Sequence, residues 1–203
     1  MGGRQRHPGE ARALSVSDRL TRIERAPAGA AVAPMDADQQ RWLRQMMARF
    51  ATGVTVVAAR HGPLLAGMTA NAIASISIDP PLLLASINRK SETHGAILGS
   101  HSFAVSILAD GQQALADCFA QKTTAAKLQR FCDAPWHDAE TGSPILDGAI
   151  AYFDCRLVAQ HPGGDHTMFV GEIVAAGFEE AAEPLIWYGS GYRRLTTQPA
   201  PEG

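Results

Sequence analysis

Short stretches in which apolar and polar residues alternate dominate the chain from about residue 50 onward. A period of two is typical of a β-strand with one buried and one solvent-facing side. Asp79-Pro-Pro81 ends one of these stretches, because proline cannot donate a hydrogen bond to a sheet. The residues from His161 to His166 form an ordered connection between the last two long stretches. Strands are predicted over residues 52–59, 64–78, 82–87, 103–108, 150–158, 168–178 and 184–188.

Helical spacing of apolar residues occurs in only a few places. The first predicted helix begins near Asp36 with Asp38 as its N-cap, and its apolar stripe is expected in the core. A second, short helix is expected from Glu92 to Leu98. A third is capped by Asp110. The stripe of the first helix consists of Trp42, Leu43, Met46, Met47 and Phe50, and that of the third of Leu115, Cys118 and Phe119.

The ratio of strands to helices decides the fold class. Six or seven short strands with few helices cannot supply the repeating βαβ units of a doubly wound parallel sheet. The pattern therefore predicts a mainly β protein, in which an antiparallel sheet closes into a barrel.

Composition and charge limit the classes of partner that the chain is expected to bind. A chain of 203 residues with a formal net charge of −2 is expected to form one domain and to lack the basic surface that nucleic acid or an anionic membrane requires. Residues 1–35 carry six arginines against three carboxylates, so this part is basic and the remainder acidic. The predicted organisation is a flexible basic arm over 1–35, a folded domain over 36–196 and a tail over 197–203. A transit peptide is disfavoured by the carboxylates in the arm.

Cysteine and histidine usage indicates neither a disulfide framework nor a metal site. Cys118, Cys132 and Cys155 are odd in number and widely spaced, which favours a reducing cytoplasmic location. His161 and His166 have no third ligand nearby, so no metal is expected. No apolar run is long enough for a membrane span or a secretory signal.

Familiar catalytic motifs are absent, since the chain has no P-loop, no nucleophile elbow and no H-E-x-x-H. Gly189-Ser-Gly191 imitates the start of a dinucleotide fingerprint, but Arg194 stands where the third glycine belongs. A nicotinamide cofactor must therefore bind without a Rossmann site.

The densest run of small and polar residues spans Gly67 to Ser77. Alternation along one strand would bring Thr69, Asn71 and Ser75 together, and Gly67 would let a ligand approach the backbone. Hydroxyl, amide and backbone N–H groups suit a planar heteroaromatic ring. A polar edge strand explains the same pattern equally well.

The segment from Ser86 to Thr93 joins a predicted strand to a predicted helix. Ser91 or Thr93 can cap the helix, free N–H groups can face an anion, and Arg89 or Lys90 can add positive charge. This turn is a candidate phosphate site, and an ordinary solvated connection is the alternative interpretation.

Taken in order, these segments resemble the flavin reductase-like family, the small reductase components of two-component flavin monooxygenases. The resemblance covers about residues 40 to 195 and implies an FMN-binding split β-barrel, antiparallel and Greek-key-like with a few flanking helices. It further implies a homodimer that uses NADH or NADPH to reduce FMN or FAD for a separate oxygenase. The motifs that carry it are Phe50-Ala-Thr-Gly-Val-Thr-Val-Val57, Gly67-Met-Thr-Ala-Asn71, Ser75-Ile-Ser-Ile-Asp-Pro-Pro81, Phe103-Ala-Val-Ser-Ile-Leu108, Gly164-Asp-His166, Gly171-Glu-Ile-Val174 and Tyr192-Arg-Arg-Leu195.

The resemblance also implies roles for individual residues. The isoalloxazine would be lined by Met68, Thr69, Ala70, Asn71 and Ser75. The phosphate and ribityl chain would be held by Ser86, Asn88, Arg89, Lys90 and Ser91. A helix beside the flavin would contribute Cys118 and Phe119, while His166 and Tyr192 would lie near the nicotinamide, with His166 as the catalytic residue. Many relatives have Ser-Phe where this chain has Ala72-Ile73, which leaves the flavin preference open.

The leading functional hypothesis is an NAD(P)H:flavin oxidoreductase of EC 1.5.1 type, in which hydride passes from the nicotinamide to the flavin and the protein supplies geometry and hydrogen-bond donors. One alternative is a flavin-binding split-barrel module without turnover, acting as a carrier or sensor. Another is an oxidase or reductase that acts on a small molecule through tightly held flavin. Arg193 and Arg194 could meet a 2′-phosphate, so the choice between NADH and NADPH stays open.

Overall fold

The computed structural model describes residues 34–121, 131–180 and 182–195. The chain divides after Met47 into two compact units. Each unit is described by itself below.

The described part of the first unit contains the helix α2 (Ala37–Met47). Asp36 caps it: its Oδ1 accepts a hydrogen bond of 2.8 Å from the backbone N–H of Gln39, and Gln39 Oε1 accepts one of 3.0 Å from the N–H of Asp36. The predicted N-cap Asp38 is therefore wrong, because this residue lies inside the first turn. The predicted core stripe is wrong as well, since no residue of α2 is buried. Amphipathic spacing identifies an apolar face but does not guarantee that another element covers it.

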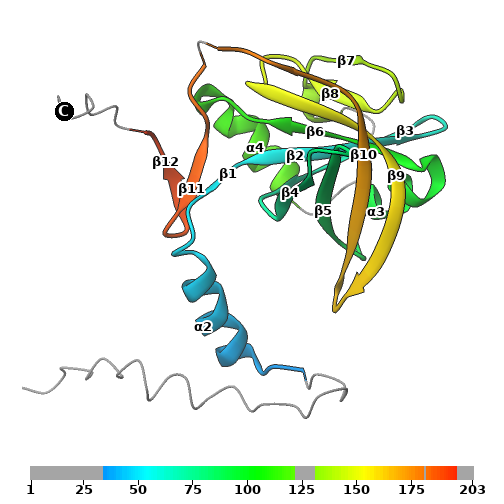
Figure 1. The fold of residues 1–203 in the computed structure, drawn as a ribbon. Helices are drawn as coiled ribbons and strands as arrows, with labels where there is room; N and C mark the ends of the chain where they lie inside the picture. The colour runs from blue at the N-terminus through cyan, green and yellow to red at the C-terminus, as the bar shows by residue number, and fades with distance from the viewer. Residues whose placement is uncertain (1–33, 122–130, 181, 196–203) are drawn as a thin grey trace, which may run out of the picture. The chain divides into compact units, whose positions relative to one another are not determined.

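A seven-stranded antiparallel sheet forms the second unit (Figure 1). The strands follow the order β3-β2-β6-β9-β10-β5-β4. The prediction of a mainly β protein built on an antiparallel sheet is confirmed. The strands are β2 (Thr55–His61), β3 (Leu64–Ala70), β4 (Ile73–Ser77), β5 (Leu82–Asn88), β6 (Ser102–Ile107), β9 (Ala151–Gly163) and β10 (His166–Phe178).

The two edge strands of this sheet are neighbours in sequence. Only Asn71 and Ala72 lie between the end of β3 and the start of β4, and consecutive Cα atoms are about 3.8 Å apart, so the two edges meet at this corner. The sheet therefore curves into a barrel. The predicted single strand through residues 64–78 is wrong, because β3 pairs with β2 whereas β4 pairs with β5.

The longest hairpin joins β9 to β10, which run side by side over thirteen residues each (Figure 1). Its turn consists only of Gly164 and Asp165, and Gly164 has a φ of +68°, which glycine adopts without strain. The ordered connection predicted at 161–166 is therefore shorter than expected, because the strands continue through it.

Smaller elements complete the unit. The helices α3 (Glu92–Ser100) and α4 (Gln113–Ala120) pack against β2 and β3. The predicted cap Asp110 is wrong: Ala109 is the N-cap of the 3₁₀ turn η1 (Asp110–Gln112), and Gln112 Oε1 accepts a 3.0 Å hydrogen bond from its N–H. The remaining elements are β1 (Thr52–Gly53), η2 (Phe131–Asp133), β7 (Trp136–Asp138), β8 (Pro144–Leu146), β11 (Ile186–Tyr188) and β12 (Gly191–Arg193).

Two apolar cores lie on the two faces of β2. Val57 packs in one core with Ile97 of α3 and Phe103, and Val56 packs in the other with Phe119 of α4 and Leu108. Because side chains alternate along a strand, a strand buried on both faces needs a continuous apolar run, and β2 supplies one.

A buried polar network joins the segment before β8 to the sheet. Asp154 of β9 is 0% exposed. Its carboxylate accepts hydrogen bonds of 2.8 Å from the backbone N–H of Thr141 and of 2.5 Å from the Thr141 hydroxyl. The Ser143 hydroxyl donates to that of Ser102 on β6 at 3.1 Å. These bonds satisfy a charge that would otherwise be unpaired in the interior.

None of the helices within the described ranges combines the length and the apolar character that crossing a membrane demands. The cytoplasmic location stays a prediction.

Candidate functional site

The main cavity lies between β3, the end of α4 and the turn that precedes α3. Its volume is about 560 Å³. The aromatic ring of Phe119 and the side chain of Met68 supply apolar surface, while Lys90 supplies positive charge. The cavity is lined by Met68, Thr69, Asn88, Lys90, Ser91, Glu92, Phe119, Ala120 and Gln121.

The turn from Asn88 to Ser91 is held by its own hydrogen bonds. Ser91 is the N-cap of α3, and its hydroxyl accepts from the N–H of His94 at 3.1 Å and donates to the carbonyl of Asn88 at 2.8 Å. Asn88 Oδ1 accepts from the N–H of Lys90 at 2.9 Å. Of the two predicted caps, the structure selects Ser91, and Thr93 is buried. A cation beside the N-terminus of a helix is a favourable place for a phosphate.

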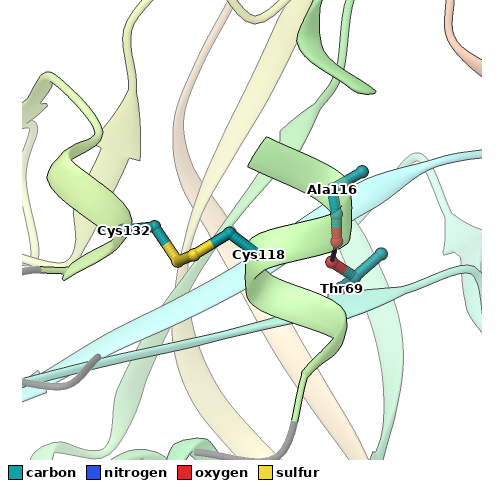
Figure 2. The surroundings of a disulfide bond; sticks show 4 residues. All are labelled: Thr69, Ala116, Cys118 and Cys132. Atoms are coloured by element: carbon teal, nitrogen blue, oxygen red, sulfur yellow. Dashed lines mark hydrogen bonds between the residues drawn. A yellow bond between two sulfur atoms is a disulfide. The ribbon is translucent and has the colours of Figure 1, made fainter. Parts of the chain in front are cut away.

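The wall of the main cavity depends on a contact between β3 and α4. The hydroxyl of Thr69 donates a 2.6 Å hydrogen bond to the carbonyl of Ala116, as Figure 2 shows. The hydrogen of this hydroxyl is therefore engaged, and only its lone pairs remain for a ligand.

The space above Gly67 is filled by protein. A Cβ at this position would lie 2.8 Å from Cε1 of Phe119 and 3.1 Å from Cε2 of Phe131. These two rings contact each other edge to face, with centroids 5.1 Å apart. The expectation that Gly67 lets a ligand approach the backbone is therefore wrong: the glycine makes room for the aromatic wall.

We expect Gly67→Ala to lower the free energy of unfolding by about 1–3 kcal/mol, because its methyl group overpacks this wall. Displacement of Phe119 should also weaken binding of the FMN that the sequence resemblance implies. Denaturant titration measures the stability, and fluorescence quenching of FMN measures the binding. Gly95→Ala in α3 is the matched control, since its Cβ meets nothing within 4 Å, and it should be neutral or stabilising. A Gly67→Ala protein as stable as wild type would contradict the packing argument.

A smaller cavity of about 210 Å³ adjoins the main one, because Thr69 and Ala120 line both. The rings of Trp187 and Tyr192 meet edge to face with centroids 5.0 Å apart. The small sheet β1-β11-β12 carries these two rings. The lining residues are Val54, Thr69, Ala70, Asn71, Ala120, Trp187 and Tyr192.

Tyr192 is anchored to α4. Its hydroxyl donates a 2.7 Å hydrogen bond to Oδ1 of Asp117. Burial, together with this bond and the charge of Asp117, raises the pKa of Tyr192 to about 12. The phenol therefore keeps its proton at neutral pH, so Tyr192 acts there as an orienting wall and not as a base.

His166 opens β10 and lies opposite Asn88 in the register with β5. Its Nδ1 lies 2.7 Å from Oδ1 of Asp165, which orients the ring. The hydrogen bond to His166, followed by the charge of His166, lowers the pKa of Asp165. His166 thus stands next to the phosphate turn, although it lines neither cavity.

The predicted site residues do not all come together. Nine of them line the two adjoining cavities. Ser75 and Ser86 line neither. Ser75 lies on β4 and Thr69 on β3, so the single strand expected to bring these two residues together is wrong. Arg89 lines a third cavity, and Cys118 lines none of these three. The nine are Met68, Thr69, Ala70, Asn71, Asn88, Lys90, Ser91, Phe119 and Tyr192.

Cys118 and Cys132 form a disulfide, with Cα atoms 6.1 Å apart (Figure 2). The expectation that no disulfide forms is wrong, because η2 returns the chain to α4 over a separation of 14 residues that carries no recognisable motif. Cys118 is therefore not a free thiol, and its place beside the flavin stays a prediction. Cys155 is the free, buried cysteine, and burial raises the pKa of its thiol to about 12.

The sequence carries no functional signal for two residues of this region. Trp187 lines the smaller cavity, and Asp117 supports it through the hydrogen bond to Tyr192. Gly189 and Ser190 form the tight turn between β11 and β12, with φ values of +62° each, so this segment is a hairpin and not a dinucleotide fingerprint. Trp187 and Thr69 line the same cavity only because β11 pairs with the distant strand β1.

Together, the two cavities suit a planar ring that carries a phosphate. One part of the site has apolar walls and the hydroxyl of Thr69. The other part has the cation of Lys90 and the N-terminus of α3, which Ser91 caps. The chain therefore has the residue types that could hold a flavin and a second planar ring beside it.

Comparison with protein families matches residues 47–196 to the flavin reductase like domain. The match contains every residue that lines the two cavities. It begins where α2 ends, and the domain limits of 36 and 196 stay a prediction.

Individual relatives cover most of the chain. The "FMN reductase (NADH) SmoA" of Agrobacterium fabrum is 37% identical over 79% of this chain and 89% of its own length. The "4-hydroxyphenylacetate 3-monooxygenase, reductase component" of Thermus thermophilus is 37% identical over 75% of this chain and 94% of its own. The solved structure of the NADH:FAD oxidoreductase SgcE6 of Streptomyces globisporus superimposes with a TM-score of 0.74 at 33% identity, covering 83% of this chain and 100% of that one. The same oxidoreductase has been solved in complex with NAD and FAD fragments.

Proposed function

The chain belongs to the flavin reductase-like family, and from this premise we propose that it is an NADH-dependent flavin reductase. It transfers hydride from reduced nicotinamide to FMN or FAD and supplies reduced flavin to a separate monooxygenase component. Its relatives support this function, since they include an NADH-dependent FMN reductase and a monooxygenase reductase component.

One observation carries the proposal: the two cavities adjoin at Thr69 and Ala120. The main cavity ends at the cationic turn before α3, which suits the flavin phosphate. The smaller cavity ends at Trp187 and Tyr192. A flavin ring that contacts Thr69 in the main cavity would leave the smaller cavity for a second ring. Hydride transfer requires two such rings to lie side by side.

When bound, the flavin and the nicotinamide supply the redox chemistry themselves, so the protein binds and orients them. Met68 and Phe119 would pack against the flavin ring. Lys90 and the N-terminus of α3 would hold its phosphate, and Asn71 would offer its amide at the rim. Trp187 and Tyr192 would exclude water from the smaller cavity, because Asp117 fixes the phenol in place.

Initial rates of NADH oxidation at 340 nm with FMN, FAD and riboflavin test this function. We expect each flavin to accelerate the loss of NADH. Failure of all three would overturn the proposal. Flavin retained through gel filtration without any oxidation of NADH would instead favour a carrier or sensor.

We propose that NADH is preferred over NADPH. Arg194 pairs with Asp110 at 3.1 Å, and Arg193 donates to the carbonyl of Tyr192 at 2.7 Å. Each guanidinium group thus already has an acceptor within the protein, which makes it less available to a 2′-phosphate. The ratio of kcat/KM values for the two nicotinamides measures the preference, and a value that favours NADPH would contradict it.

We further propose that His166, which the family resemblance places near the nicotinamide, contacts that cofactor from its position beside the turn before α3. His166→Ala should slow flavin reduction by about tenfold, the loss expected for one orienting hydrogen bond, while flavin affinity changes little. Stopped-flow bleaching of flavin at 450 nm gives the rate, and fluorescence quenching gives the affinity. His137→Ala is the control, because His137 pairs with Asp147 on the exposed surface. Equal losses of rate and affinity would contradict a nicotinamide-side role.

We also propose that the chain forms a homodimer. Ile76 lies on the edge strand β4 and is exposed. Ile78, the first residue after the end of β4, is 86% exposed. An exposed apolar edge strand favours pairing with another chain. Light scattering after gel filtration should give twice the 21.6 kDa mass of one chain, and the monomer mass would contradict the dimer.

A further inference from the structure

A third cavity lies between α3 and the end of the β9–β10 hairpin. Its volume is about 370 Å³, within the range of ligand pockets. Arg89 lines it, whereas the neighbouring Asn88, Lys90 and Ser91 line the main cavity. Arg89 is the chain neighbour of Asn88 and Lys90, and consecutive Cα atoms are about 3.8 Å apart, so the two cavities meet at this turn. A ligand that extends over the turn would therefore reach both. The lining residues are Arg89, His94, Leu98, Gln160, His161, Pro162 and Thr167.

This cavity offers donors that the protein itself does not use. The guanidinium of Arg89 makes no ion pair with any residue in the described ranges, and the side chains of Gln160 and His161 make no hydrogen bond there. No carboxylate lines the cavity. The carboxylate of nearby Asp165 is engaged by His166. A cation with free polar donors and no competing anion suits an anionic ligand.

The remaining lining residues form a rigid and partly apolar floor. His94 is held by a 2.9 Å hydrogen bond between its Nε2 and the hydroxyl of Thr167, and its ring lies 5.2 Å from that of Phe169. Burial, together with the charge of Arg89, lowers the pKa of His94, so its ring is neutral at pH 7. Leu98 and Pro162 add apolar surface, which suits the flat face of a nucleobase.

We propose that this cavity binds an adenylate group, the second half of a dinucleotide whose reacting half lies in the site formed by the main cavity and the smaller cavity. The inference rests on the proposed function, because FAD and NADH each join an adenylate to the reacting half through a diphosphate. FMN ends at its single phosphate and does not extend past the turn. Arg89 would bind the phosphate of the adenylate, and Gln160 and His161 would face its base.

Arg89→Gln tests the site through binding and kinetics together. Calorimetry of the flavin-free protein gives Kd values for FMN and FAD, and initial rates give the KM for NADH. Loss of a charge-assisted bond should weaken one dinucleotide by about ten- to a hundredfold and leave FMN unchanged. A change confined to FAD assigns the cavity to the flavin, and a raised KM for NADH with either flavin assigns it to the nicotinamide cofactor.

Two control variants show whether the effect is specific to Arg89. Lys90→Gln should weaken FMN and FAD by equal factors, because Lys90 lines the main cavity. Arg156→Gln, on the exposed face of β9, should alter neither. Equal effects of Arg89→Gln on FMN and FAD, or no effect on either flavin and on NADH, would overturn the adenylate site. If the wild-type protein oxidises NADH with FMN in the same assays, the proposed function survives that failure.

Discussion

Replacing Asp154 by alanine should lower the free energy of unfolding by about 3–5 kcal/mol. The substitution removes the acceptor of two hydrogen bonds, from the N–H and the hydroxyl of Thr141. The backbone N–H of Thr141 is then left without its acceptor, whereas the Thr141 hydroxyl still has Ser143 Oγ at 2.9 Å. Each hydrogen bond to a charged group contributes about 1.5–3 kcal/mol, and the substitution removes two of them. Urea titration followed by tryptophan fluorescence measures the change.

Asp138→Ala is the matched control for this experiment. The same side chain is removed, but Asp138 is exposed and pairs with Arg60 on the surface. Such pairs contribute about 0–1 kcal/mol. Asp154→Asn retains the size and one acceptor oxygen, so its loss should lie between those of the two alanine variants. An Asp154→Ala protein that unfolds at the wild-type midpoint would show that the network contributes no net stability.

The double substitution Cys118→Ser and Cys132→Ser should lower the free energy of unfolding by about 2–4 kcal/mol. The bond closes a loop over a separation of 14 residues, and in the chain-entropy account closing a loop of about that length is worth roughly 3 kcal/mol. The effect should extend to flavin binding. Ala116, Asp117, Phe119 and Ala120, on either side of Cys118, all contact the site or the residues that form it.

Reductant provides the decisive comparison for the disulfide. Dithiothreitol should destabilise the wild-type protein by the same amount and leave the double variant unchanged. Thiol titration of the denatured, unreduced protein should find one free cysteine, Cys155. Cys155→Ala serves as the control, since it should retain the sensitivity to reductant. Three titratable thiols in the wild-type protein, or stability that is unaffected by dithiothreitol, would contradict the bond.

Local signals predicted the features that depend on neighbouring residues. The alternation at β2, the break at Asp79-Pro-Pro81 and the cap at Ser91 each follow from a few consecutive side chains. The turn from Asn88 to Ser91 could likewise be identified as a candidate phosphate site, because the cap, the helix start and the cation lie within four residues. The strand, the break, the turn and the cap appear in the structure where the sequence predicted them, and the binding of a phosphate at the turn stays a prediction.

Features that depend on distant pairing could not be predicted in the same way. Thr69 and Ser75 share one polar pattern, yet Asn71 and Ala72 send their strands to opposite edges of the sheet. Gly67 looks like an open approach to the backbone, yet Phe119 and Phe131 fill the space above it. A period of two identifies the face of a strand but not the partner across it.

The sequence by itself therefore determined the antiparallel β character of this protein, the capped turn before α3 and, through its ordered motifs, the family. Only the tertiary structure decided which residues share a cavity, that Cys118 bonds to Cys132, and that Trp187 closes the site with Tyr192. The physical reason is the range of the interactions. Strand propensity and helix capping act within a few residues, whereas packing, disulfide pairing and cavity formation join segments that the chain separates and only the closed sheet brings together.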